Sequence, residues 1–356
     1  MSTATKTVEK STNEKVIWGS DLHLHTSFWQ QEVNRYRPSV WLLVKFAVLY
    51  TYFKGMTDLG GAYWPRIVQY CNEKNIDPAD IALPGAMGLA FTFFAIYGYG
   101  FFGFINYYCD DWDFFKRIRI HKGDWAWVTD PREDGSGVYS DMFKAWLFNN
   151  SLYIPTFPLV KYVIGTSCPF RTDADSLPGY FELIWQVAFS VVCFDVVFYH
   201  IHRMLHHKDF YWIHRKHHSV TVVVGPVGAF YHPIDEWLEA ITASLFGPLL
   251  LWDKMHIVSF QAWFVFAIWA ALEIHCGYEL PWNMYQALPF SVDARYHDFH
   301  HRYHHRGNYA AVFTIWDYIY GTNKEYYEWV RNGGPFEDFT DVPFDENNKV
   351  QQKKLN

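Results

Sequence analysis

The histidines of this chain are concentrated in one part of the sequence. The chain contains 18 histidines in 356 residues, and 15 of them lie between residues 200 and 305, where an even distribution would place about five. Most of these 15 fall into three groups, at residues 202–207, 214–218 and 297–301. A single histidine is usually an ordinary core or surface residue, but three spaced groups indicate a shared chemical role.

The spacing within the groups suits metal binding. Residues three and four apart lie on the same face of a helix, so each group would present two or three imidazoles together. Neutral imidazole binds zinc, copper, iron and nickel. Eight converging histidines exceed the four ligands of one tetrahedral zinc, so the count favours two metal ions. The predicted ligands are His202, His206, His214, His217, His218, His297, His300 and His301, with His275 as a further ligand.

Acidic residues near these groups are candidates to orient the imidazoles. Asp195 precedes His202 by seven residues, two turns along the same helical face. An acid in an apolar helix is costly and generally functional, and accepting the second N–H of a ligand imidazole is its natural role. Glu273, two residues before His275, is a second candidate of the same kind. Weaker candidates are Asp235, Glu236 and Asp298.

The elements that carry these residues are predicted to be helices in a membrane. The sequence is 50% hydrophobic and 21% aromatic, and residues 83–108 contain no charged side chain, which is the length of a membrane span. Further apolar stretches cover residues 142–164 and 178–200, and the pair 238–252 and 257–274 could form a hairpin in the membrane. The sequence therefore predicts an all-α polytopic membrane protein with about four transmembrane helices and a cytosolic, histidine-rich helical cap. A soluble helical bundle is the alternative, and the uncharged stretch argues against it.

Charge and cysteine content exclude several classes of function. The net charge of −7 and the absence of long basic runs give no indication of nucleic-acid binding. The five cysteines form no Cys-x-x-Cys pair and indicate neither a disulfide framework nor a thiolate metal site. No P-loop, G-x-S-x-G or His-Glu-x-x-His motif is present, and a haem would leave most of the histidines unused.

Three regions are predicted along the chain. Residues 1–37 are a polar, disordered tail, residues 38–327 form the membrane-embedded domain with its histidine region at 195–305, and residues 328–356 are a polar tail. Basic residues interleave with the histidines, which places that region in the cytosol. The chain ends in Lys353-Lys354-Leu355-Asn356, a dilysine signal for retrieval to the endoplasmic reticulum. The expected location is therefore the membrane of that organelle.

The histidine groups resemble the three histidine boxes of the fatty acid hydroxylase/sterol desaturase superfamily. Within it, residues 195–206, 275–282, 297–301, 307–309 and 313–322 resemble the C-4 methylsterol monooxygenases, as does the His232-Pro233 pair. The resemblance covers about residues 145–327. Residues 222–231 depart from the family's Thr-Pro-Phe-Gly and Glu-Tyr-Ala pattern, and His304 and His305 extend the third box. These departures bear on the substrate and leave open whether His232, His304 or His305 binds metal.

The resemblance implies a particular chemistry. Such an enzyme uses a non-haem di-iron centre and O2 to oxidise the C-4 methyl group of a sterol in sterol biosynthesis. Its electrons come from NAD(P)H through cytochrome b5 and its reductase, and a separate sterol C-4 decarboxylase removes the resulting carboxylate. Other reactions of the superfamily stay open, namely sphingolipid or fatty-acyl hydroxylation and sterol C-5 desaturation. The alternative from a different class is a membrane metal transporter with histidines along its path. Such a protein would need polar residues along several spans, whereas the histidines here gather at one end.

Overall fold

The computed structural model describes residues 27–36, 38–121, 125 and 137–331, and in this part of the chain the regular structure is helical, with isolated bridges but no strand. The α-helices are α1 (Phe28–Arg35), α2 (Val40–Lys74), α3 (Pro78–Phe93), α4 (Asp113–Ile118), α6 (Gly137–Ser151), α7 (Thr156–Ile164), α8 (Tyr180–Leu205), α9 (Tyr211–His214), α10 (Pro233–Asp235), α11 (Thr242–Leu251), α12 (Ile257–Ile274), α13 (Ala294–Arg302), α14 (Ile315–Tyr320) and α15 (Lys324–Arg331). The π-helical segments are η1 (Phe94–Phe102), η2 (Ile105–Cys109) and η5 (Glu236–Ile241), and the 3-10 turns are η3 (His217–Ser219), η4 (Gly225–Ala229), η6 (Trp252–Lys254) and η7 (Met284–Ala287).

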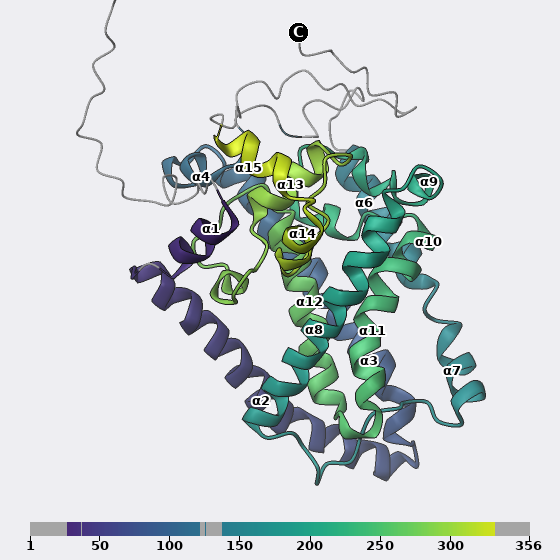
Figure 1. The fold of residues 1–356 in the computed structure, drawn as a ribbon. Coiled ribbons are helices and arrows are strands. Elements are labelled where there is room, and N and C mark those ends of the chain that lie inside the picture. The colour runs from purple at the N-terminus through teal and green to yellow at the C-terminus, as the bar shows by residue number, and fades with distance from the viewer. Residues whose placement is uncertain (1–26, 37, 122–124, 126–136, 332–356) are drawn as a thin grey trace, which may run out of the picture.

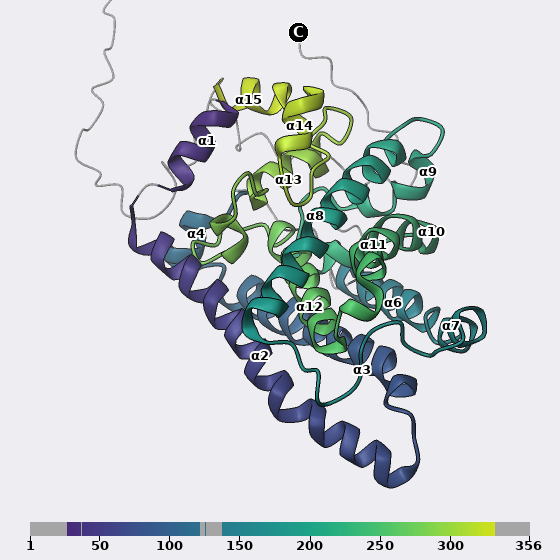
Figure 2. The same ribbon diagram turned by 60° about the horizontal axis from the view of Figure 1, so that its bottom comes forward.

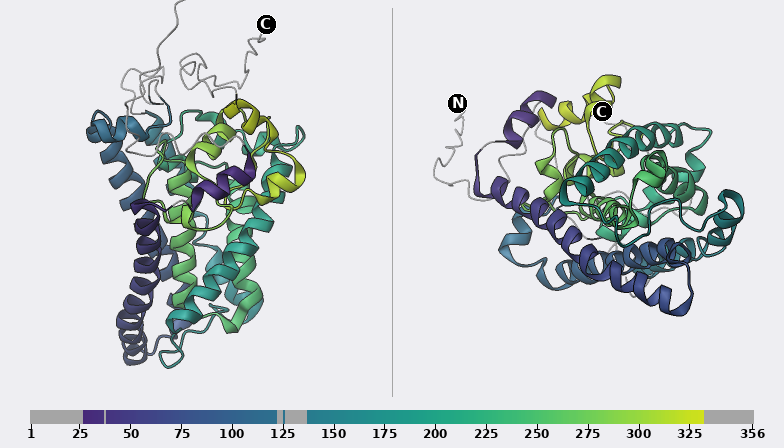
Figure 3. Two further views of the ribbon diagram at one scale, coloured as in Figure 1. Left: turned by 60° about the vertical axis from the view of Figure 1, so that its left-hand side comes forward. Right: turned by 90° about the horizontal axis from the view of Figure 1, so that it is seen from below.

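Long helices form a bundle, and short helices cover one of its ends. In Figure 1 the helices α2, α3, α8, α11 and α12 extend downward, while α13, α14 and α15 gather at the top. Figure 2 and both views of Figure 3 show α12 in the interior of the bundle and α2 along one side. Most residues of α12 are buried, and this helix contacts α2, α3, α8 and α13. The predicted helical architecture with a histidine-rich cap is thus confirmed in the described residues.

Three helical segments are long and apolar enough to cross a bilayer, namely Pro78–Cys109, Tyr180–Leu205 and Ile257–Ile274. They correspond to the predicted stretches 83–108, 178–200 and 257–274. The stretch 142–164 does not form one span, because the chain turns between α6 and α7, where Pro155 caps the second helix. The other half of the predicted hairpin is divided between η5 and α11. The count of about four spans is therefore approximate.

Residues 28–35 correct the prediction of a disordered tail. They form α1, which the side chain of Ser27 caps by accepting a hydrogen bond from the Gln30 amide. The ring of Phe28 stacks on Phe290 and on Tyr318, with centroids 5.5 and 4.3 Å apart. Burial of this ring compensates for the ordering of a short polar helix. The rest of the N-terminal tail, and the dilysine signal, lie outside the described residues.

The packing of α8 and α12 brings the histidine-bearing segments together. Helix α11 packs closely on α8, since a Cβ at Gly247 would lie 2.8 Å from the Ser190 Cα. Helix α8 also contacts α12, and α12 contacts α13. As a result, the carboxyl ends of α8 and α12 and the whole of α13 meet at the capped end of the bundle (Figure 1).

Candidate metal centre

The three histidine boxes occupy different local structures. Box one lies at the end of α8, with His202 in the last turns and His206 at the cap position. Box three lies on α13, whose first turn is capped by Asp293 accepting a hydrogen bond from the Tyr296 amide at 2.8 Å. Box two departs from the predicted single helix, because α9 ends at His214 and the following residues form the 3-10 turn η3.

All nine predicted histidines converge, and they do so in two neighbouring groups. Within each group one nitrogen of every ring lies within 4.8 Å of those of the other members. The groups also adjoin each other, because the rings of His218 and His301 are 4.6 Å apart between centroids. We call the first group cluster one, formed by His202, His206, His214, His218 and His300, and the second cluster two, formed by His217, His275, His297 and His301.

Histidines four apart in the sequence share a cluster, whereas the third histidine of box two and of box three belongs to the other cluster. In box two, His214 and His218 belong to cluster one, and His217 belongs to cluster two. In box three, His297 and His301 belong to cluster two, while His300 turns to cluster one. Boxes two and three therefore contribute to both clusters, so a shift of either segment would move ligands of both sites.

Backbone carbonyls orient three of the imidazoles. The Nδ1–H of His202 donates to the Tyr309 carbonyl at 2.7 Å, that of His275 to Ala271 at 2.6 Å and that of His300 to Gly307 at 2.8 Å. These bonds assign the proton to Nδ1, so Nε2 is unprotonated and its lone pair faces the cluster. Sequence reasoning missed the carbonyl acceptors, although the stretches 307–309 and 313–322 marked the loop that supplies two of them.

The nitrogens are spaced as ligands of a shared cation. The Nε2 atoms of His202 and His300 are 3.1 Å apart, and the Nε2 atoms of His275 and His297 are 2.9 Å apart. Nitrogens about 2.1 Å from one ion lie roughly 3.0–3.4 Å apart at ligand angles of about 90–110°. Because Nδ1 carries the proton in both His202 and His300, their facing lone pairs repel unless a cation lies between them. The donor set therefore fits a metal in each cluster.

Several buried imidazole nitrogens have no hydrogen-bond partner among the described residues. Such atoms occur in both clusters, and leaving them unpaired in a protein interior is costly. A metal ion would satisfy the nitrogens that face the cluster centres. The unpartnered atoms are His214 Nε2, His217 Nδ1, both nitrogens of His218, His297 Nδ1 and both nitrogens of His301.

Burial keeps these imidazoles neutral. It lowers the pKa of His275 to about 4 and that of His300 to about 3, against the ordinary 6.5. Burial, followed by the neighbouring histidines, also holds the pKa of His217, His218 and His301 well below that value. Since only a neutral imidazole binds a metal, the rings are in the ligand form at neutral pH.

The two acids predicted to orient the imidazoles bind other groups. Asp195 accepts hydrogen bonds from the Phe313 amide at 2.9 Å and from Trp316 Nε1 at 2.8 Å, so it holds the loop before α14 and not a box-one ring. Seven residues separate it from His202 by about 10 Å of helix, too far for direct contact. Glu273 accepts from the Tyr97 hydroxyl and from Trp269 Nε1, both at 2.8 Å, and two positions along a helix it faces away from His275.

Asp235, a weaker candidate, takes the role expected of Asp195. Its carboxylate accepts the Nδ1–H of His214 at 2.8 Å, and both side chains are fully buried. Glu239, one turn later and missed by the sequence reasoning, lies 3.4 Å from the same nitrogen. Its position four residues after Asp235 in an apolar segment was the available signal. Glu236 instead accepts a hydrogen bond from the Tyr153 hydroxyl.

The remaining histidines lie at the edge of the clusters or outside them. Asp298 pairs with His121 Nε2 at 2.5 Å, and His121 lies outside the predicted boxes. His232 caps α10 by accepting from the Ile234 amide. His304 stacks on Tyr211 at 5.1 Å and borders cluster one without joining it, and His305 is exposed.

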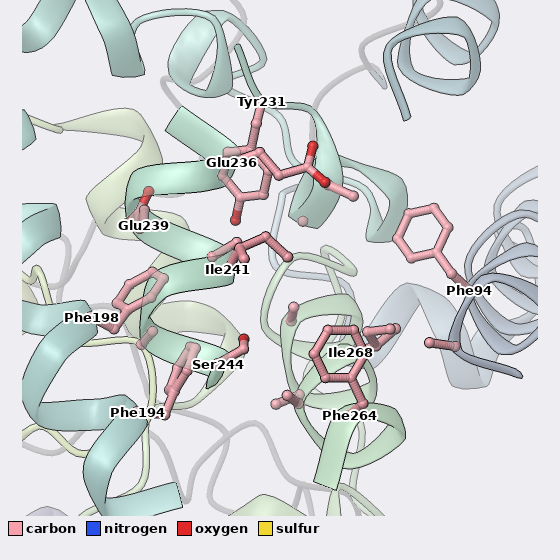
Figure 4. Close-up of a pocket in the computed structure, with 18 of the residues that line it drawn as sticks. Phe94, Phe194, Phe198, Tyr231, Glu236, Glu239, Ile241, Ser244, Phe264 and Ile268 are labelled. Atoms are coloured by element: carbon pink, nitrogen blue, oxygen red, sulfur yellow. The ribbon is translucent and has the colours of Figure 1, made fainter. Parts of the chain in front are cut away.

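A cavity of about 150 Å³ reaches both clusters from within the bundle. It touches His202 of cluster one and His217, His275 and His297 of cluster two. Its wall is mainly apolar and aromatic, and Figure 4 shows Phe194, Phe198, Phe264 and Ile268 around it. Helices α8, α11 and α12 contribute to the wall, together with α3, η1, α6, η4 and η5. The arrangement suits an apolar molecule held beside two metal ions.

Comparisons with known proteins support this picture. Residues 187–322, which include all nine histidines, match the fatty acid hydroxylase family. The chain is 35% identical over 217 residues to methylsterol monooxygenase 1 of Rattus norvegicus, covering 60% of the chain and 69% of that protein. It is 34% identical over 183 residues to methylsterol monooxygenase 2-2 of Arabidopsis thaliana, covering 51% and 67%.

A relative of different chemistry also matches. The chain is 34% identical over 203 residues to very-long-chain aldehyde decarbonylase GL1-10 of rice, Oryza sativa subsp. japonica, covering 55% of the chain and 63% of that protein. The chain thus spans about two thirds of the length of these relatives. No solved structure matches it.

Proposed function

This chain belongs to the fatty acid hydroxylase family, and from that membership we propose that it is a membrane monooxygenase that oxidises the C-4 methyl group of sterol precursors in sterol biosynthesis. Methylsterol monooxygenases from a mammal and a plant are among its relatives. The observation that carries the proposal is the convergence of nine histidines, eight of them buried and His206 half-buried, in two clusters at the end of an apolar cavity.

Two iron ions are the proposed cofactors, one held by cluster one and the other by cluster two. When bound, they would supply the activation of O2 that oxidation of an unactivated methyl group requires. An all-nitrogen donor set of five and four imidazoles suits iron. The electrons are expected from NAD(P)H through cytochrome b5 and its reductase, because the G-x-G-x-x-G run at residues 98–103 continues a helix and does not follow a strand as a dinucleotide-binding loop would.

The residues of the chain hold the reactants and exclude water. Carbonyls and Asp235 fix the orientation of ligand rings, so the metal-facing nitrogens need no rearrangement when an ion binds. The cavity wall, formed by side chains such as Phe194, Phe198 and Trp263, offers a dry surface to a sterol. A sterol in the bilayer would enter between the helices and place its methyl group beside the clusters.

The proposed location is the endoplasmic-reticulum membrane, with the clusters on the cytosolic side. Exposed basic residues such as Arg203 and Arg215 lie beside the boxes, in keeping with the positive-inside rule. A cytosolic centre would be accessible to cytochrome b5, and its product would be accessible to a sterol C-4 decarboxylase.

The experiment compares membranes containing the chain with membranes containing a His297→Ala variant. Both receive 4,4-dimethyl or 4-methyl sterol, NADH and O2, with or without cytochrome b5, and sterols are followed by mass spectrometry. We expect 4-hydroxymethyl and 4-carboxy sterols from the natural chain only, with faster formation when cytochrome b5 is present. The proposal fails if neither sterol is consumed while a fatty acid, a ceramide or an aldehyde is converted.

A further inference from the structure

The cavity beside the metal centre has one polar end. Most of its lining side chains are hydrocarbon, but Tyr231, Glu236 and Glu239 gather at one end of it (Figure 4). Glu236 and Glu239 both belong to η5, and the Tyr231 ring stacks on His217 of cluster two at 4.7 Å. Two carboxyl groups in an apolar cavity are costly, so each needs a partner or a function.

Glu236 has its partner within the protein. The Tyr153 hydroxyl, in the turn between α6 and α7, donates a hydrogen bond to its carboxylate, and Lys216 lies near enough to interact with it electrostatically. Both residues line the cavity, so this pair joins η5 to the turn after α6 in its wall. Glu236 therefore needs no further group to satisfy its carboxyl oxygens.

Glu239 differs, because no N–H or O–H of the described residues donates to either of its oxygens. The side chain is fully buried and lines the cavity. Two neighbouring imidazole N–H groups are already used elsewhere, since His214 donates to Asp235 at 2.8 Å and His202 donates to the Tyr309 carbonyl at 2.7 Å. A proton shared with the adjacent Asp235 would satisfy one oxygen of Glu239 and leave the other for a ligand.

The position of Glu239 relates this free acceptor to the reaction. Its oxygens lie 3.4 Å from His214 Nδ1 and 3.8 Å from His202 Nδ1, and both rings belong to cluster one. A donor group bound by Glu239 would therefore hold its neighbouring carbon atoms close to that cluster. A carboxyl acceptor favours hydroxyl groups and disfavours carboxylate substrates, because like charges repel in a buried site.

We propose that Glu239 is a specificity residue that accepts a hydrogen bond from a hydroxyl group of the substrate, on a carbon next to the one that carries the oxidised methyl group. The inference rests on the proposed function, since in a 4-methyl sterol the 3-hydroxyl lies on the carbon adjacent to C-4. Glu239 then selects apolar molecules with a hydroxyl at that position and directs the C-4 methyl group toward cluster one.

The test uses two sterols that differ only in the proposed contact, 4,4-dimethyl sterol with its 3-hydroxyl and the 3-deoxy analogue. The kcat/KM of each is measured for the natural chain, Glu239→Leu and Glu239→Gln. We expect the natural chain to prefer the hydroxyl sterol about 3–10-fold, the size of one hydrogen bond between uncharged groups. Glu239→Leu should lower that ratio to about 1 without loss of metal, and Glu239→Gln, which keeps an acceptor oxygen, should lie between.

Glu236→Gln is the matched control, because it removes an equal charge from the same end of the cavity and should leave the preference in place. An equal preference in the natural chain and in Glu239→Leu would overturn the inference while leaving the proposed function intact. Loss of iron from Glu239→Leu would overturn it too, by assigning Glu239 to the metal centre. If Glu239→Leu does not fold, equal use of both sterols by the natural chain overturns the inference. Consumption of neither sterol by the natural chain would overturn both proposals.

Discussion

Two buried aspartates allow a controlled test of which acid supports the metal centre. Asp235 accepts the Nδ1–H of His214 at 2.8 Å, whereas Asp195 accepts from the Phe313 amide and from Trp316. Hydrogen bonds to charged groups contribute about 1.5–3 kcal/mol, and a supporting carboxylate behind a ligand imidazole typically changes metal affinity 10–100-fold. Replacing each aspartate should therefore separate support of the metal from support of the loop.

Asp235→Leu removes the acceptor at nearly constant volume, and Asp235→Asn keeps a neutral oxygen in its place. We expect the leucine variant to bind the cluster-one ion about 10–100-fold more weakly. The asparagine variant should lose about fivefold, since charge-assisted bonds are roughly twice as strong as neutral ones. Glu239, 3.4 Å from the same His214 nitrogen, can replace part of the interaction, so the lower end of the first range is the expected result.

The assay is competition between the purified protein in detergent and an iron chelator, with the iron released per chain measured at each chelator concentration. Asp235→Leu should release one ion at a lower chelator concentration than the natural chain does and retain the other ion. Asp195→Asn should release both ions at the chelator concentrations found for the natural chain. The reasoning is refuted if Asp235→Leu follows the natural curve, or if Asp195→Asn releases an ion early.

Three further predictions follow from the surroundings of the clusters. Gly228→Ala should lower the iron held by cluster two, because its Cβ would lie 2.9 Å from the Ala271 carbonyl and 3.1 Å from His275 Nδ1; chelator release will measure it. Asp317→Asn should weaken the cluster-one ion and lower the melting temperature, since Asp317 accepts from the Tyr309 and Ala310 amides of the loop that orients a box-one ring; binding and thermal unfolding will show it. Burial depresses the pKa of His275 to about 4, so the unfolded chain takes up the proton first as the pH falls; this ring alone should cost the metal-free protein about 3 kcal/mol between pH 6.5 and 4 in denaturant titrations, and His300 should add to that loss.

The metal-facing residues could be predicted because their chemistry is visible in spacing. Imidazoles in three groups of helical spacing had to converge on something, and the apolar stretches identified the helices that carry them. The distribution between clusters was not predicted, because it depends on where a helix ends. Box two leaves the α-helical path after His214, which allows His217 and His218 to face different clusters.

The supporting acids were harder to predict, because periodicity describes a helical face but not what lies opposite it. Asp195 shares a face with His202, yet it lies two turns away and meets the loop before α14. Asp235 follows a proline at the start of a three-residue helix, so no periodic pattern connected it with His214. Carbonyl acceptors such as Tyr309 leave still less trace, since any residue type can provide one.

The most direct measurement of the two-ion centre is an anomalous difference map, collected at the iron absorption edge from crystals of the iron-loaded protein. Two peaks are predicted, one among the imidazoles of cluster one and the other among those of cluster two. A single peak, or peaks away from these nine histidines, would contradict the assignment of the clusters as a di-iron site.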